Sequence, residues 1–151
     1  MVPMDRDMGK LAPSFRLRIE AVVADLEAEG FTPWVVECVR TAERQAWLYA
    51  QGRTRPGSIV TKAPTHVSSW HGHGLAVDII DRVKHWGATQ AFWQSLGAAC
   101  GRHGVTWGGN WKSFPDRPHC QDGRVPGGPS KVDRDRTLGS GMAATWEAYN
   151  L

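Results

Sequence analysis

Two short clusters of residues carry side chains that could hold a metal ion. The first (SWHGHGLAVD) places His71 in a glycine-containing loop and Asp78 on the strand that follows. Zinc in catalytic sites binds neutral imidazole and carboxylate groups and keeps one coordination position open. Gly72 and Gly74 would let the loop fold back closely over its own strand. On their own, however, a histidine and an aspartate at this spacing are more often unrelated surface groups.

The second cluster (DRPH) runs from Asp116 to His119. Pro118 biases the residue before it away from helix, so this segment is predicted to be a turn that enters a strand. In that setting His119 could reach a metal, and Asp116 could take a proton from an attacking water in metal-assisted amide hydrolysis. Taken alone, the same four residues are more typical of a capped surface turn.

Together, the two clusters resemble the zinc D-Ala-D-Ala carboxypeptidase / L-alanyl-D-glutamate endopeptidase family, which cuts the peptides of bacterial peptidoglycan. The shared pattern is Ser-x-His, an aspartate seven residues after that histidine, then Trp-Gly-Gly and Asp-x-x-His. It covers roughly residues 36–121 and is most similar to the phage-endolysin-type branch. The resemblance implies that His71, Asp78 and His119 bind Zn2+ and that Asp116 is the catalytic base.

The resemblance also implies roles for polar residues near the metal. In this family, an arginine at the position of Arg40 stabilises the negative charge that develops on the reacting carbonyl oxygen. Gln45 and Ser69 are implied to bind substrate, although Gln45 is equally typical of a helix surface and Ser69 could instead orient the loop. His73 lies where the family usually has no ligand. It could chelate the metal together with His71, but we expect it instead to be solvated or to support a ligand without touching the metal.

The elements that must position these residues follow from hydrophobic periodicity. The predicted helices are residues 14–29, 42–51 and 89–103, and the predicted strands are residues 32–39, 75–80 and about 119–121. The segment 53–70 has little periodicity and is predicted to be an active-site loop. Within the second strand, alternation places Asp78 on the face opposite to Leu75, Val77 and Ile79.

This order of elements predicts a small single α+β domain over residues 1–151. A central antiparallel sheet should be flanked by helices, with the zinc in a cleft on the sheet. The core is expected to span about residues 14–121. Residues 122–151 begin with a stretch rich in glycine, proline and charge, which predicts a flexible tail that ends in a short helix.

The composition is that of an ordinary globular protein, with 41% hydrophobic and 22% charged residues and a net charge of +3. This mild positive charge suits approach to an anionic cell wall. No run of like charges supports a nucleic-acid partner. Because the start lacks the apolar segment of a signal peptide, we expect cytoplasmic synthesis, no membrane insertion, and a monomer that reaches the wall after phage-type membrane permeabilisation.

The sequence therefore predicts a zinc metallopeptidase that hydrolyses the stem peptide of peptidoglycan, at the L-alanyl-D-glutamate bond. Two alternatives keep the metal: a D-alanyl-D-alanine carboxypeptidase with the same zinc chemistry, and a non-catalytic metal-bearing binding module. A third is a cysteine hydrolase that uses Cys38 or Cys120. We expect both thiols to be buried, because Cys38 lies in an apolar strand and Cys120 faces away from His119 on a strand.

Overall fold

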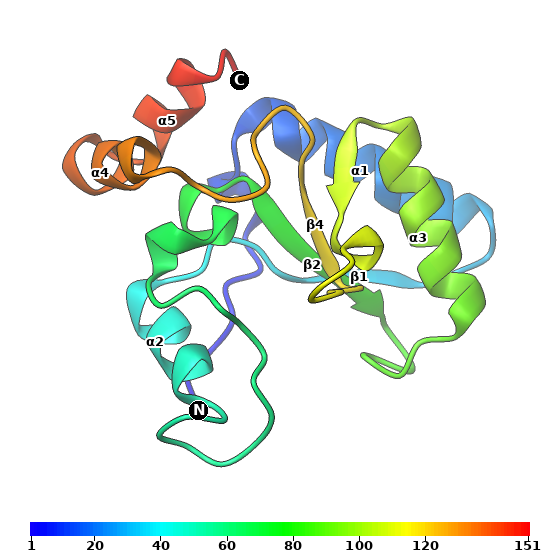
Figure 1. Cartoon of the computed structure of the whole chain (residues 1–151). Helices are drawn as coiled ribbons and strands as arrows, with labels where there is room; N and C mark the ends of the chain where they lie inside the picture. The colour runs from blue at the N-terminus through cyan, green and yellow to red at the C-terminus, as the bar shows by residue number, and fades with distance from the viewer.

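A four-stranded antiparallel sheet forms the centre of the molecule. The computed structural model describes residues 1–151, and Figure 1 shows helices gathered around the sheet. The strand order is β1-β2-β4-β3, and each neighbouring pair is antiparallel. The strands are β1 (Pro33–Glu37), β2 (Ala76–Asp81), β3 (Val105–Trp107) and β4 (His119–Asp122). The predicted α+β fold with a central antiparallel sheet is confirmed.

Five α-helices and four short 3-10 helices surround this sheet. In Figure 1, α1 and α3 lie at one side of the sheet, whereas α2, α4 and α5 lie at the other. The α-helices are α1 (Pro13–Ala28), α2 (Ala42–Ala50), α3 (Gln90–Arg102), α4 (Lys131–Ser140) and α5 (Met142–Ala148). The 3-10 helices are η1 (Met8–Lys10), η2 (His66–Ser68), η3 (Trp70–His73) and η4 (Gly108–Asn110). None of these helices has the length and apolar character needed to cross a membrane.

The hydrophobic core lies between α1, α3 and one face of the sheet. Helix α1 contributes an apolar stripe at helical spacing, made of Phe15, Ile19, Val22 and Leu26, all fully buried. Helix α3 contributes Phe92, Trp93, Leu96, Ala99 and Cys100. From β2, Val77 and Ile79 join this cluster, while Asp78 between them is only partly buried. The alternation predicted for this strand places Asp78 on the opposite face, between the buried side chains of Ala76 and Ile80.

Helix α2 begins where the sequence predicts. The side-chain oxygen of Thr41 accepts a hydrogen bond from the backbone N–H of Arg44 at 3.1 Å and so satisfies a free donor of the first turn. Because the helix starts directly after Arg40, this arginine is fixed at the junction between the end of β1 and α2.

The segment from Asp122 onward corrects the expectation of a flexible tail, since it contains α4 as well as the expected terminal helix α5. A capping box starts α4: Ser130 Oγ accepts from the Asp133 N–H at 3.1 Å, and Asp133 Oδ2 accepts from the Ser130 N–H at 2.8 Å. The Tyr149 hydroxyl then donates to Asp133 at 2.9 Å, which joins the two helices. The Gly- and Pro-rich composition obscured this Ser-x-x-Asp signal.

The C-terminal helices are attached to η3 through His73. This histidine is fully buried, not solvated, and its Nε2–H donates to the Val67 carbonyl at 2.8 Å. Its Nδ1 therefore accepts from the Thr137 hydroxyl at 2.7 Å, and Thr137 in turn accepts from the Thr145 hydroxyl at 2.7 Å. Trp146 Nε1 donates to the His73 carbonyl at 2.6 Å. Burial lowers the pKa of His73, in keeping with this neutral, fully paired ring.

A substitution of Thr137 by valine should destabilise the protein. Valine keeps the shape but removes the hydroxyl, so His73 Nδ1 loses its donor and Thr145 loses its acceptor inside the protein. We expect a loss of about 1–3 kcal/mol in the free energy of unfolding, measured by urea denaturation. Thr137→Ser keeps the hydroxyl and serves as the control. If the valine variant were as stable as wild type and the serine variant less so, the methyl group and not the hydroxyl would matter.

Candidate metal centre and active-site cleft

The proposed ligands come from three elements that meet on the polar face of the sheet. Asp78 on β2 lies directly opposite His119 on β4 in the antiparallel register, so both side chains point to the same face. His71 belongs to η3, which immediately precedes β2. Gly72 allows η3 to pass against η2, because a β-carbon on it would lie 2.0 Å from the carbonyl oxygen of His66.

The three side chains form a triangle of the right size for one ion. His71 Nε2 lies 3.4 Å from Asp78 Oδ1, and His119 Nδ1 lies 3.9 Å from the same oxygen. One donor atom from each residue falls within 4.8 Å of the other two. The structure thus brings together all three residues that the sequence motifs single out as ligands, although their binding of a metal remains a proposal.

The hydrogen bonds of the two imidazoles leave one nitrogen of each free for a metal. His71 Nδ1–H donates to the Cys38 carbonyl at 2.9 Å, and its Nε2 is buried without any hydrogen-bond partner. His119 Nε2–H donates to Gln121 Oε1 at 2.8 Å, which leaves Nδ1 facing Asp78. A buried, unpaired ring nitrogen is unfavourable in a protein and is satisfied by a metal ion. The donor set of two neutral imidazoles and one carboxylate fits Zn2+.

Gln121 fixes the orientation of His119. Its amide nitrogen donates to the carbonyl oxygens of Pro126 and Gly127, both at 3.3 Å, so its oxygen must face the imidazole. The side chain is 2% exposed. Sequence reasoning missed this residue, although a strand position two residues after His119 lies on the same face and could have revealed it.

The charges around the triangle favour an ionised Asp78 beside a neutral His119. Burial raises the pKa of Asp78, but the attraction of His71, Arg40 and His119 outweighs burial and holds this pKa well below its usual range. Burial lowers the pKa of His119 to about 4. Both groups are therefore in the protonation state that metal ligation requires.

Asp116 reaches the same cleft through a tight turn. Its carbonyl accepts from the His119 N–H at 3.2 Å, and its own N–H donates to the Gly108 carbonyl at 2.9 Å. Gly108 has no room for a side chain, since a β-carbon would lie 2.5 Å from the Asp116 carbonyl oxygen. Burial, together with repulsion from Asp78, raises the pKa of Asp116 to about 7. A carboxyl group in this state can both accept and return a proton near neutral pH.

Arg40 is held rigidly at the edge of the triangle. Its Nε and one terminal nitrogen donate to Glu37 Oε1 at 3.1 and 2.7 Å, and the same terminal nitrogen lies 3.3 Å from Asp78 Oδ2. Glu37 also accepts from Arg44 Nε at 3.0 Å and is 2% exposed. A buried carboxylate between two guanidinium groups is well paired and fixes both. Nothing in the sequence singles out Glu37, because a lone glutamate at the end of an apolar strand belongs to no motif.

The two residues expected to bind substrate occupy different positions. Gln45 is fully buried: its oxygen accepts from Arg40 at 3.1 Å and its nitrogen donates to the Ala63 carbonyl at 2.7 Å. It therefore supports Arg40 from behind and has no surface free for a ligand. Ser69 lines the cleft, and its hydroxyl accepts from the His71 N–H at 3.3 Å, which caps η3. This contact favours the loop-orienting role for Ser69.

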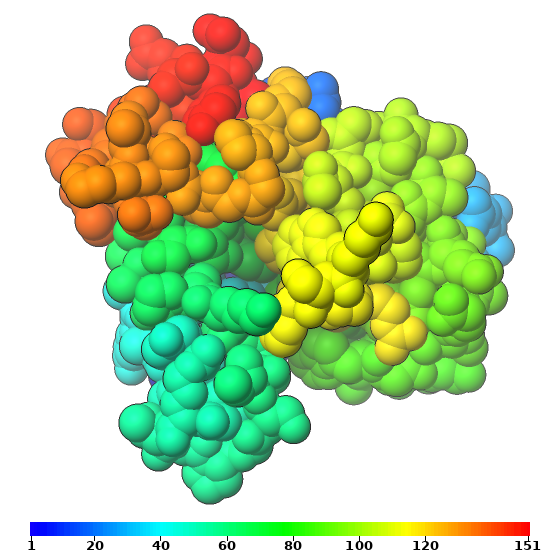
Figure 2. Space-filling model, in the orientation of Figure 1, coloured from blue at the N-terminus to red at the C-terminus, as the bar shows by residue number.

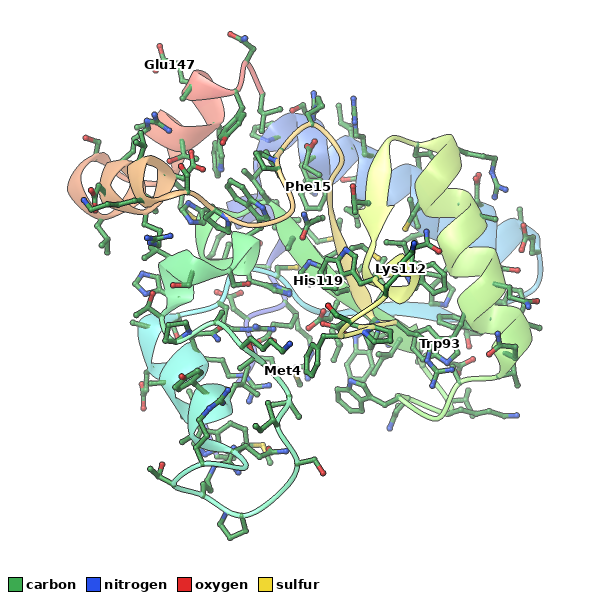
Figure 3. All side chains as sticks on the ribbon, viewed as in Figure 1. Met4, Phe15, Trp93, Lys112, His119 and Glu147 are labelled. Carbon is green, nitrogen blue, oxygen red and sulfur yellow. The ribbon has the colours of Figure 1, made fainter.

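The three proposed ligands, together with Arg40, Ser69 and Asp116, line one cleft of about 820 Å³. Figure 2 shows the hollow between the segment that precedes η2 and the yellow loop that follows η4. Figure 3 shows His119 near the centre of the molecule, beside the loop that carries Lys112. The charged residues of the lining are Glu37, Arg40, Arg44, Lys62, Asp78 and Asp116, together with the two histidines of the triangle.

Comparison with known proteins identifies the family. Residues 62–122, from the end of the long loop to the end of β4, match the peptidase M15 model described as D-alanyl-D-alanine carboxypeptidase. The chain is 31% identical over 122 residues to the peptidoglycan L-alanyl-D-glutamate endopeptidase CwlK of Bacillus subtilis, across 74% of this chain and 72% of CwlK. The chain belongs to the M15 peptidase family. The family resemblance noted in the sequence motifs is confirmed.

Other proteins are similar to part of the chain or share its fold. An L-alanyl-D-glutamate peptidase of a Listeria phage is 26% identical over 119 residues, across 76% of this chain and 39% of that protein. The L-Ala D-Glu endopeptidase ChiX of Serratia marcescens superposes with a TM-score of 0.54 at 22% identity, covering 76% of this chain and 81% of ChiX. A mutant of the vancomycin-resistance D,D-pentapeptidase VanY, solved with Zn(II), gives 0.59 at 16% identity over 93% of this chain and 84% of VanY. At these identities the two structures establish the shared fold alone.

A substitution of Gln121 by leucine should weaken zinc binding. Without the amide oxygen, His119 Nε2–H has no acceptor, and the ring is free to rotate or to change tautomer. We expect zinc affinity to fall about 10- to 100-fold, measured by competition with a chelating dye. Gln94→Leu, the same change at an exposed position of α3, should leave affinity unchanged. An unaltered zinc Kd in a folded Gln121→Leu protein would show that Gln121 does not orient the ligand.

Proposed function

We propose that this chain is a zinc-dependent peptidoglycan endopeptidase that hydrolyses the L-alanyl-D-glutamate bond of the stem peptide. The observation that carries the proposal is the triangle of His71, Asp78 and His119 in one cleft with Asp116 and Arg40. Two relatives with matching sequences, CwlK and the Listeria phage protein, are L-alanyl-D-glutamate peptidases. Their names support the choice of the scissile bond.

In this proposal, His71, Asp78 and His119 would hold the Zn2+, which would supply a Lewis acid for the scissile carbonyl. Asp116 takes the proton from the attacking water and passes it to the leaving amine. Arg40, fixed by Glu37 and Gln45, presents its guanidinium to the carbonyl oxygen as negative charge develops there. Because these groups are held in place before substrate arrives, little reorganisation is needed in the transition state.

Three other readings of the site are less well supported. A D-alanyl-D-alanine carboxypeptidase would use the same residues, but the VanY structure supports it through the shared fold alone. A cysteine nucleophile is disfavoured because Cys38, Cys100 and Cys120 are all buried, and burial raises the pKa of Cys38 to about 12. A non-catalytic binding module would have no use for a carboxyl group and a guanidinium aimed at the same space as the ligands.

Every residue in the proposed mechanism comes from one chain, so a monomer is sufficient for activity. The proposed partner is the peptidoglycan stem peptide, and the proposed place of action is the cell wall, reached after phage-type membrane permeabilisation. The Listeria phage relative supports this route.

Digestion of purified peptidoglycan tests the function directly. The zinc-loaded protein should release fragments with new N-terminal D-glutamate, detected by mass analysis, and a chelated sample should release none. Free D-alanine as the product would instead assign the protein to the carboxypeptidase branch. If neither product formed, a binding module would be the better interpretation.

A substitution of Asp116 by asparagine should separate metal binding from turnover. The variant keeps the size of the side chain and leaves the three ligands in place, so one Zn2+ should still bind. Removal of the proton acceptor should lower kcat about 100-fold or more. Asp135→Asn, the same change at an exposed position of α4, should have full activity. Normal turnover in Asp116→Asn would remove this residue from the mechanism.

A further inference from the structure

One cation of the cleft has no partner in the protein. Three positively charged side chains, Arg40, Arg44 and Lys62, line the cleft, and both arginines are paired with Glu37. Lys62 has no carboxylate within 4.0 Å, and none of its ammonium protons makes a hydrogen bond to the protein. A cation that lines a substrate cleft without a counter-ion favours an anionic ligand.

Contact with the opposite wall places this ammonium group across the cleft. Lys62 belongs to the loop that precedes η2, whereas Phe114 belongs to the loop that follows η4. The ammonium nitrogen lies 5.2 Å from the centre of the Phe114 ring, within the range of a cation–π contact. Figure 2 shows these two segments approaching each other over the hollow. The contact orients the ammonium group while its protons remain available to a ligand.

The backbone on both sides of Lys62 is tied to the support of Arg40. Gln45 donates to the Ala63 carbonyl at 2.7 Å and to Thr61 Oγ1 at 3.4 Å, and it accepts from Arg40 at 3.1 Å. Thr61 Oγ1 also accepts from the Ala63 N–H at 3.1 Å. The position of Lys62 along the cleft is therefore set relative to the guanidinium that faces the reacting carbonyl oxygen.

We propose that Lys62 is a specificity-determining residue that binds a carboxylate next to the scissile bond, so that the substrate is an acidic peptide. The inference rests on the proposed function. In an L-alanyl-D-glutamate bond, the nitrogen of the glutamate is the leaving amine. The stem continues through the side-chain carboxyl group, so the α-carboxylate is free and lies one carbon from that nitrogen. Lys62 pairs with this carboxylate and thereby positions the scissile bond next to the triangle of His71, Asp78 and His119.

Two synthetic peptides test the proposal: one with the free D-glutamate α-carboxylate, and one with an α-carboxamide, which has the same shape and no charge. Wild type should cleave the carboxylate peptide with the higher kcat/KM. Lys62→Met should lower kcat/KM about fivefold for the carboxylate peptide and leave the carboxamide peptide unchanged. Lys62→Arg should restore most of the preference. Lys112→Met removes the same charge from an exposed position outside the cleft and should keep the wild-type preference.

The outcomes separate the two proposals. If wild type cleaved both peptides and Lys62→Met lowered both values equally, Lys62 would not read the carboxylate, and the peptidase function would stand. If Lys112→Met lost the preference as well, general attraction to the basic protein would explain it and Lys62 would have no specific role. If wild type cleaved neither peptide while its zinc was fully bound, the proposed scissile bond would be wrong, and the role of Lys62 with it.

Discussion

The Asp78 carboxylate lies between two imidazoles, with Oδ1 3.4 Å from His71 Nε2 and 3.9 Å from His119 Nδ1. Burial lowers the pKa of His119 to about 4, so this imidazole does not neutralise the aspartate by taking a proton. Arg40 contributes the one guanidinium contact to the carboxylate. The unpaired Nε2 of His71 in this cluster favours a further cation, because a buried lone pair without a partner is unfavourable. In the proposed zinc site, metal binding would therefore stabilise this face of the sheet.

This constraint explains why the strand register matters chemically. The outer nitrogen of His71 is fixed by the Cys38 carbonyl just after β1, and that of His119 is fixed by Gln121 on β4. Asp78 lies on β2 between these two strands. A slip of one residue in the pairing of β2 with β4 would turn Asp78 or His119 into the apolar core and bring an apolar side chain to the site. The hydrophobic pattern that buries Val77 and Ile79 thus also secures the ligand set.

The sequence was informative where a short segment contains the whole signal. Strand alternation predicts the face of Asp78, and Thr41 predicts the start of α2. The sequence was uninformative where the role of a side chain depends on contacts that form only in the folded chain. The role of Glu37 becomes visible only in the fold, where Arg40 and Arg44 both donate hydrogen bonds to its carboxylate.

Short or compositionally masked elements were also missed. Strand β3 (Val105–Trp107) has three residues, too few to show a period, and exists through pairing with β4. Helix α4 lies in a stretch whose glycines and prolines suggest loop, and it is stabilised by packing of its neighbour α5 against η3. In each case tertiary contacts, and not local propensity, decide the structure. His73 shows the same limit, since its burial depends on hydroxyl groups more than sixty residues away.

In the proposed mechanism, the charges of the cleft determine the direction in which the peptide binds. Asp116 enters from the turn before β4, Arg40 from the end of β1, and Lys62 from the loop before η2. The proposed base, oxyanion partner and free cation lie on three separate segments. A peptide bound in the opposite direction would therefore place neither its leaving amine at Asp116 nor its carboxylate at Lys62. Gln45 links two of these segments through hydrogen bonds to Arg40 and Ala63. The fold therefore fixes the spacing between Arg40, the proposed oxyanion partner, and Lys62, the proposed carboxylate partner. In the proposed mechanism, discrimination against a neutral peptide follows from the unpaired Lys62 ammonium, and Asp116 and the proposed metal ligands determine the rate of hydrolysis.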